Sequence, residues 1–275
     1  ESAKYYYEDF TKKGITTGGP IEILQCPDSE SAFALLETFI ILYETSGDDM
    51  FLTMAEDATA QFSSWCIPYD FIFPENSEFR KHGIKTTGAV VANIQNKHGA
   101  PGICTMSGDS LFKLFRATGK IEHIELLQSI SHGIVQYISR NDRPITAWDG
   151  QVMPSGWICE RVNLSDWEGK DNVGGVFYCP CWCEVSMMLT YAEIPGIYLQ
   201  SDINRLFVFD HVECSIIKVN DKDTELKIFN PTKYDAKVKL FVEETKDCVN
   251  PLDFDWISGC KVVEIKSLET VKIRV

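Results

Sequence analysis

Two segments of this chain repeat one helical pattern, and the repeat narrows the choice of fold. A tight turn at Ser46-Gly47 follows one apolar helix, and an equivalent turn at Thr118-Gly119 follows another, so the two turn glycines are 72 positions apart. Matching apolar residues then recur at helical spacing: Leu52, Ala55, Ala58 and Phe62 in the first copy, and Ile124, Leu127, Ile130 and Ile134 in the second. This repeat predicts helical hairpins packed side by side.

The connections between helices fall into two length classes. The expected helices occupy 1–12, 29–45, 48–66 and 182–193. In each hairpin we call the helix before the tight turn the inner helix, such as 29–45, and the helix after it the outer helix, such as 48–66. Long loops, at roughly 13–29, 67–106 and 141–180, lead from one hairpin to the inner helix of the next. All the long loops should then gather at one end of the helices, which we expect to be the functional rim.

The period of the sequence changes near Ile197 from helical to alternating. Expected strands occupy Thr224 to Phe229, Lys237 to Val242, Lys261 to Ile265 and Thr270 to Val275. The pair Pro195-Gly196 ends the last helix. We therefore predict an α+β chain, in which 1–196 forms part of an α/α toroid and 197–275 forms a C-terminal antiparallel β-sandwich.

Charge and composition limit the classes of partner that we expect for this chain. A formal net charge of −14 repels phosphate backbones and anionic lipid, so we expect no nucleic acid and no membrane. Neutral ligands fit better. The ten cysteines leave the compartment open. The thiol-rich sequence favours the cytoplasm, while a secreted or periplasmic location stays an alternative.

Aromatic residues concentrate in the last long loop, where helical periodicity is lost. Trp148, Trp157 and Trp167 fall there, and Trp182 follows at the start of the next expected helix. Indole faces stack on the apolar faces of sugar rings, so we expect these residues to bind substrate, together with His98 and Asp70 on the same rim. The alternative is that the loop has a small core of its own.

Carboxylates lie among these tryptophans. Glycosidic cleavage uses one protonated carboxyl as an acid and a second group that attacks or activates water. Glu160 and Asp149 are the predicted catalytic pair, because a loop rich in tryptophan desolvates a carboxyl and raises its pKa. Glu184, at the start of an inner helix, is predicted to be either a rim residue or a plain helix cap.

Four cysteines lie close to the starts of two inner helices. Cys104 precedes one of them, and Cys179, Cys181 and Cys183 flank the next. Zinc takes four soft or borderline ligands in a tetrahedron, so Cys104, Cys179 and Cys181 are predicted zinc ligands. The alternatives are that these residues are small buried hydrophobes or that they form disulfides.

Several short motifs relate the chain to a known family. The segments in question are Thr86-Thr87-Gly88, Gly102-Ile103-Cys104, Tyr178-Cys179-Pro180 and Ile194-Pro195-Gly196-Ile197-Tyr198. Over roughly residues 30–245 the chain resembles the six-hairpin glycosidases and, among them, the zinc- and cysteine-dependent β-L-arabinofuranosidases. The resemblance implies an α/α toroid, a following β-sandwich, glycosidase activity, and zinc held by Cys104 and Cys179.

Two positions depart from the family pattern. Gly102 stands where the family has a zinc-binding glutamate, and Tyr178 stands where it has the cysteine nucleophile. The first hypothesis is therefore a glycoside hydrolase for a neutral oligo- or polysaccharide, without the cysteine mechanism. The alternative is a non-catalytic glycan-binding or scaffold subunit. In either case we expect the remaining hairpins of the toroid to come from a homo-oligomer or from an N-terminal half.

Overall fold

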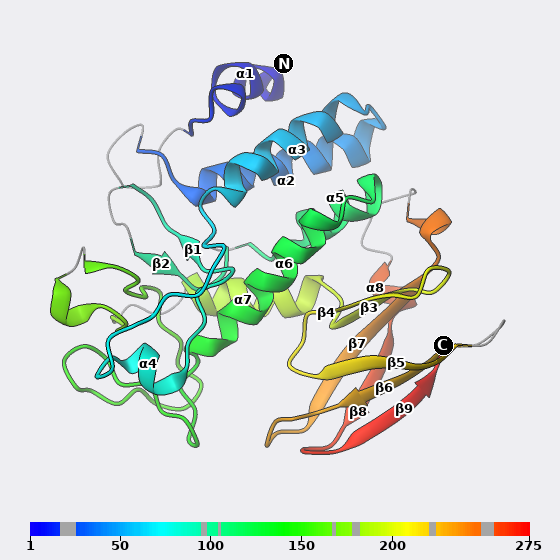
Figure 1. Cartoon of the computed structure of the whole chain (residues 1–275). Helices are drawn as coiled ribbons and strands as arrows, with labels where there is room; N and C mark the ends of the chain where they lie inside the picture. Colours follow the sequence, from blue (N-terminus) through cyan, green and yellow to red (C-terminus); the bar gives the residue numbers. More distant parts are fainter. Residues whose placement is uncertain are drawn as a thin grey trace.

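A computed structural model describes residues 1–16, 26–94, 98–103, 106–166, 169–177, 182–219, 224–248 and 256–275 of the chain (Figure 1). Helices and loops make up the part before residue 196, and strands dominate the part after it. This confirms the predicted order of helical hairpins followed by a β region. Within the described residues, no helix is both long and apolar enough to span a membrane.

The helical part is built from hairpins. Helix α2 (Ser29–Ser46) turns into α3 (Met50–Ser63), and α5 (Asp109–Thr118) turns into α6 (Ile121–Ile134). The flanking elements are α1 (Ser2–Asp9), the 3-10 turn η1 (Thr11–Lys13) and α7 (Trp182–Glu193). The helices expected from the sequence are confirmed, with small shifts at their ends.

The two hairpins turn in the same way. Gly47 and Gly119 both have left-handed backbone conformations, with φ of 67° and 70°, which glycine adopts without steric cost. Each donates its N–H to the residue four positions earlier, Tyr43 in one hairpin and Phe115 in the other. Of the matched apolar residues, all but Leu52 are buried. The repeat is therefore a structural repeat.

The long loops contain short elements that the sequence did not predict. These are α4 (Glu78–His82), β1 (Val90–Val91), β2 (Gly99–Ala100) and the 3-10 turn η4 (Lys170–Asn172). A further 3-10 turn, η2 (Val135–Tyr137), directly follows α6. Isolated bridges join Gly99 to Val162 and Val162 to Val176. Three loop segments therefore lie side by side, at the left of Figure 1.

The C-terminal strands form two sheets. They are β3 (Ile197–Gln200), β4 (Arg205–Val208), β5 (Glu213–Val219), β6 (Thr224–Phe229), β7 (Ala236–Glu243), β8 (Lys261–Ile265) and β9 (Thr270–Arg274), with η5 (Thr245–Asp247) and α8 (Trp256–Gly259) between β7 and β8. One sheet has the order β4-β3-β7-β8 and the other β5-β6-β9. The prediction of a mainly antiparallel β region is confirmed, with one exception: β3 pairs parallel with β7, whereas the other pairs in these two sheets are antiparallel. Those two strands are far apart in sequence but are direct neighbours in the sheet.

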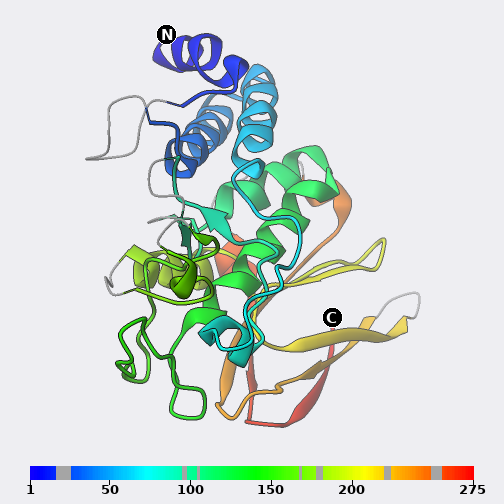
Figure 2. The same ribbon diagram turned by 60° about the vertical axis from the view of Figure 1, so that its left-hand side comes forward.

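The two sheets pack face to face over an aliphatic core. Residues Leu199, Leu226, Leu240 and Ile265 belong to it, and they come from both sheets. A second and larger core joins the helices to the sandwich, since Phe112 and Phe115 of α5 contact Tyr198 edge to face. The change from helix to strand falls at the predicted boundary, but the hydrophobic core crosses it. Figure 2 shows the helical part beside the strands.

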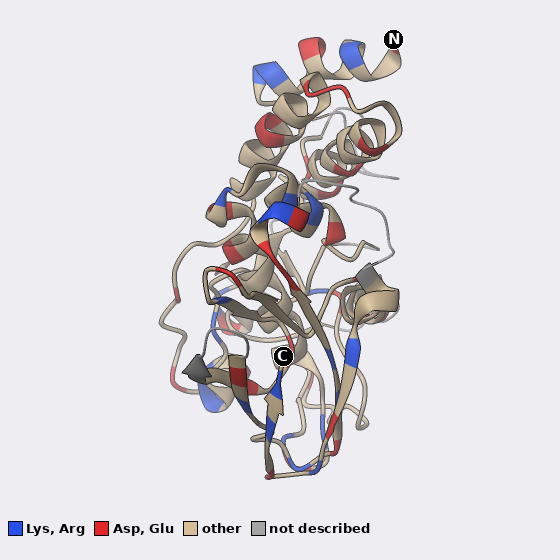
Figure 3. Ribbon diagram, turned by 90° about the vertical axis from the view of Figure 1, so that its right-hand side faces the viewer, with Lys and Arg blue, Asp and Glu red and all other residues tan. Residues whose placement is uncertain are grey.

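A buried ion pair fastens the helices to the sandwich. Arg116 of α5 donates two hydrogen bonds to the Glu243 carboxylate at the end of β7, at 3.0 and 2.9 Å. The Tyr198 hydroxyl donates to the same carboxylate at 2.6 Å. The remaining acidic and basic residues are mixed along both helices and strands (Figure 3).

Candidate functional site

Three loop segments bring an aromatic stack to the surface. The Trp148 N–H donates to the Val176 carbonyl, and the Phe177 N–H donates to the Arg161 carbonyl, both at 3.1 Å. The Trp148 and Phe177 ring centroids are 6.0 Å apart, and the Arg161 guanidinium carbon lies 5.4 Å from the Phe177 centroid. Trp148 is 55% exposed. Its indole is therefore open to a ligand.

A half-buried carboxyl group adjoins this stack. Glu160 directly precedes Arg161 in the chain. Burial raises the pKa of Glu160 above its ordinary value; the Arg161 charge opposes that shift and the Glu184 charge adds to it. Glu160 is thus a carboxyl group that keeps its proton to a higher pH than an exposed glutamate.

Glu184 supplies a second carboxyl from a different element. It lies half-buried in the first turn of α7. An acidic side chain is electrostatically favourable there, because backbone N–H groups leave a partial positive charge at a helix start. The Glu184 charge also adds to burial in raising the pKa of the Cys159 thiol. The Glu184 charge at the start of α7 thus acts on both Cys159 and Glu160.

The predicted tryptophans do not all face solvent. Trp182 is 45% exposed at the start of α7, as Trp148 is on its loop. Trp157 is half-buried and packs against the main core of the molecule. Trp167 lies outside the described residues. The substrate-binding role of these residues stays a prediction.

Two further predicted carboxylates are hydrogen-bonded within their own loops, and the predicted His98 is buried. Asp149 Oδ1 accepts the Gln151 N–H at 3.1 Å. Asp70 Oδ1 accepts the N–H groups of Thr86 and Thr87, both at 3.1 Å, and backbone hydrogen bonding by Thr87 helps lower the pKa of Asp70 to about 2. His98 is buried beneath the loops. The contacts of Asp149 and Asp70 favour roles in loop structure. The carboxylate whose charge helps raise the pKa of Glu160 is Glu184 and not the predicted Asp149.

The proposed zinc ligands Cys104, Cys179 and Cys181 lie outside the described residues. Within the part of the chain that the structure describes, no group of three or more His, Cys, Asp or Glu residues could hold a metal ion. The described cysteines are free thiols, and Cys183 is buried.

The residue at position 102 does not fit the zinc site of the family. Gly102 has φ of 77°, and a Cβ there would lie 2.5 Å from Ser186 Oγ. A glutamate therefore has no room at this position. The difference from the family pattern is built into the packing of α7 against this loop.

Sequence reasoning missed part of this surface. Arg161 and Phe177 are not predicted site residues, although both lie within the tryptophan-rich loop. Their contribution depends on bridges between segments far apart in sequence, which no local pattern reports. Glu184 is predicted as a rim residue or a helix cap, but no sequence pattern indicates that its charge acts on Glu160.

A comparison with protein-family models, with curated proteins and with solved structures found no match for this chain.

Proposed function

We propose that this protein is a glycoside hydrolase that acts on a neutral glycan at the loop surface of Trp148, Glu160, Arg161, Phe177 and Glu184. The observation that carries the proposal is the Glu160 carboxyl, whose pKa is raised by burial and by Glu184 beside an exposed aromatic stack. Two carboxyl groups and a sugar-stacking surface are the parts that glycosidic cleavage uses.

The environments of the two carboxyls give them different roles. Glu160 is suited to donate a proton to the leaving glycosidic oxygen, because its raised pKa keeps the proton available. Glu184, in the first turn of α7, is suited to act as the carboxylate that attacks the sugar or activates water. Trp148 and Phe177 offer the faces on which a sugar ring stacks.

The toroid forms part of the same proposal. The α2–α3 and α5–α6 hairpins repeat side by side, and α7 is a candidate inner helix of a third hairpin. Apolar side chains stand in solvent on the inner helices, among them Met188 of α7, which is 65% exposed. Further hairpins, from a homo-oligomer or from an N-terminal half, would cover these side chains.

Zinc at Cys104, Cys179 and Cys181 stays a separate prediction, and the proposed mechanism does not use it. Elemental analysis of protein purified with zinc present tests it, with a Cys104→Ser variant as control. One zinc per chain that is lost in the variant supports the prediction. Zinc-free wild-type protein contradicts it.

A non-catalytic glycan-binding subunit is the second candidate. The packing at Gly102 favours it, because the family's metal-binding glutamate has no room there. In that case Trp148 contributes to affinity, and Glu160 and Glu184 do not contribute to turnover.

The test compares isosteric variants on a panel of neutral aryl glycosides and oligosaccharides. We expect Glu160→Gln and Glu184→Gln to lower kcat by about 10²–10⁴-fold, the scale of lost acid–base catalysis. Asp149→Asn is the matched control and should stay near wild type. Hydrolysis that survives in both glutamine variants contradicts the mechanism. Glycan binding that depends on Trp148, without any hydrolysis, supports the binding subunit instead.

A further inference from the structure

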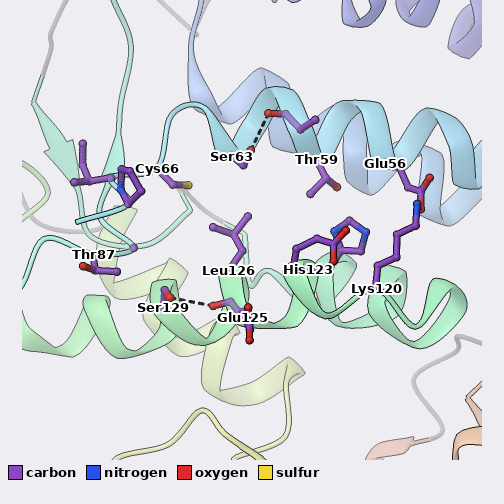
Figure 4. Close-up of a pocket in the computed structure, with 15 residues that line it drawn as sticks. Glu56, Thr59, Ser63, Cys66, Thr87, Lys120, His123, Glu125, Leu126 and Ser129 are labelled. Carbon is purple, nitrogen blue, oxygen red and sulfur yellow. Dashed lines mark hydrogen bonds and ion pairs between the residues drawn. The ribbon is translucent and has the colours of Figure 1, made fainter. Parts of the chain in front are cut away.

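A trough runs between the two outer helices, α3 and α6 (Figure 4). Helix α3 lines one side with Glu56, Thr59, Ala60 and Ser63, and α6 lines the other with Glu122, His123, Glu125, Leu126 and Ser129. The segments 66–68 and 87–88 close one end, and Lys120 lies at the other. The cavity of about 590 Å³ is within the range typical of small-molecule sites.

The hydroxyl groups that line the trough are already hydrogen-bonded. Thr59 Oγ1 donates to the Ala55 carbonyl, Ser63 Oγ to that of Ala60 and Ser129 Oγ to that of Glu125, at 2.8 to 2.9 Å. Each bond lies within a single helix. The walls therefore offer mainly hydrocarbon to a ligand, with Leu126 on one side.

His123 is the exception among these polar groups. It is 5% exposed, and neither ring nitrogen has a hydrogen-bond partner among the described residues. Burial lowers the pKa of His123, so the ring is neutral near pH 7, with one N–H donor and one acceptor. Figure 4 shows the ring between the helices, beside Thr59 and the Glu56–Lys120 pair. Unpartnered buried groups are rare and costly, so these nitrogens indicate a missing partner.

The charges around the trough select the sign of that partner. Glu56, Glu122 and Glu125 line it, against the single cation Lys120. The Lys120 ammonium lies 2.5 Å from Glu56 Oε1 on a side chain that is 49% exposed. The chain's own lysine thus marks a position where an ammonium group is stable beside His123, and an exposed lysine is free to swing away.

We propose that this trough binds a small primary amine with an apolar body. The ligand's ammonium group takes the place of Lys120 at Glu56 and donates to the neutral His123 ring, while its hydrocarbon lies along Leu126. None of these residues belongs to the loop surface assigned to glycan, so the two proposals stand or fall separately.

The test uses three probes of equal chain length: n-hexylammonium, hexanol and hexanoate. Binding to the full chain is followed by calorimetry and by NMR of the His123 ring nitrogens. We expect one hexylammonium to bind per chain, at least tenfold more tightly than hexanol, with no binding of hexanoate. The His123 nitrogen resonances should shift on binding.

Three variants locate the site. Lys120→Met removes the internal competitor and should tighten hexylammonium binding several-fold, whereas His123→Leu should weaken it at least tenfold. Lys12→Met, which removes an exposed lysine paired with Glu8 on α1, is the matched control and should change nothing. Equal affinity for the three probes overturns the proposal. So does binding that is unchanged in Lys120→Met, a surface variant that leaves the fold intact.

Discussion

At the scale of single residues, the most consequential side chains are charged groups taken out of water. Arg116 and Glu243 are both buried, and they form a two-point hydrogen-bonded ion pair through Nε and Nη2 of the guanidinium group. Removing one partner leaves an uncompensated charge in a low-dielectric interior. The exposed pairs on the surface lack this consequence, because water screens them.

We therefore predict that Glu243→Ala lowers the free energy of unfolding by about 3–5 kcal/mol, the typical cost of breaking a buried pair. Urea denaturation measures this loss. The matched control is Glu264→Ala, which breaks the well-exposed pair with Lys237 and should cost about 0–1 kcal/mol. The double variant Arg116→Met with Glu243→Leu should recover part of the loss. Equal losses in the two single variants would show that the buried pair is not special.

A second residue-scale prediction concerns pH. The folded pKa of Glu160 is raised, so the folded chain holds this proton more tightly than the unfolded chain does. Its contribution favours folding below the unfolded pKa and is lost as pH rises through the folded pKa. As pH rises through this window, the free energy of unfolding of the wild type should therefore fall relative to that of Glu160→Gln.

Carbon-13 NMR of the side-chain carboxyl measures the titration of Glu160 directly. Glu184→Gln should lower the pKa of Glu160, because the Glu184 charge is one of the causes that raise it. An Arg161→Met variant should raise the pKa further. An unchanged titration in both variants would mean that burial alone sets the value.

At the scale of elements, α7 is positioned by close contact with the loop before α5. Ser186 Oγ donates to the carbonyls of Ile103 and Met106, at 3.0 and 3.2 Å, and Thr190 Oγ1 donates to that of Ser107 at 3.1 Å. Gly102 permits this approach, since a Cβ there would collide with Ser186 Oγ. The start of α7 carries Glu184, so this packing also sets the proposed site.

We predict that Gly102→Ala is more destabilising than Gly150→Ala. Both glycines have positive φ, so both changes cost about 1–2 kcal/mol in backbone strain. Only Gly102 adds a collision, worth about 1–3 kcal/mol more, because the space around Gly150 is open. Thermal unfolding of the two variants gives the comparison. Equal losses would show that the loop yields.

At the scale of the whole molecule, the helices and the sandwich share one hydrophobic core. Aromatic rings from α5, β3, β4 and β7 form a continuous cluster that includes Phe112, Tyr198, Phe207 and Phe241. Neither part buries these rings alone. If one part unfolded alone, these rings would be exposed to water at a cost in free energy, so we do not expect the two parts to unfold as independent domains.

We accordingly predict a single cooperative unfolding transition. Native-state hydrogen exchange should show α5 and β7 opening together, and Phe112→Ala should lower the protection of both by about 3–5 kcal/mol. Ile41→Ala, at an exposed position on α2, is the control and should leave both nearly unchanged. Protection that falls in α5 alone would establish two independent domains.

Local chemistry determined much of the fold. Glycine turns at 47 and 119 and the apolar stripes behind them predicted the hairpins, because a helical period and a left-handed cap are properties of neighbouring residues. The alternating pattern after Ile197 predicted the strands for the same reason. Strand pairing was not predictable, since β3 and β7 meet across about forty residues.

Tertiary structure alone decided the candidate sites. The sequence by itself identified Trp148 and Glu160 and placed them in one loop, because residue type and loop composition are local. The sequence paired Glu160 with Asp149, a carboxylate of the same loop. The folded chain instead brings the charge of Glu184 to Glu160. His123 likewise is, in the sequence, one of several polar residues on an amphipathic helix. Its unpartnered nitrogens exist only because α3 packs beside α6 and takes water away from the ring.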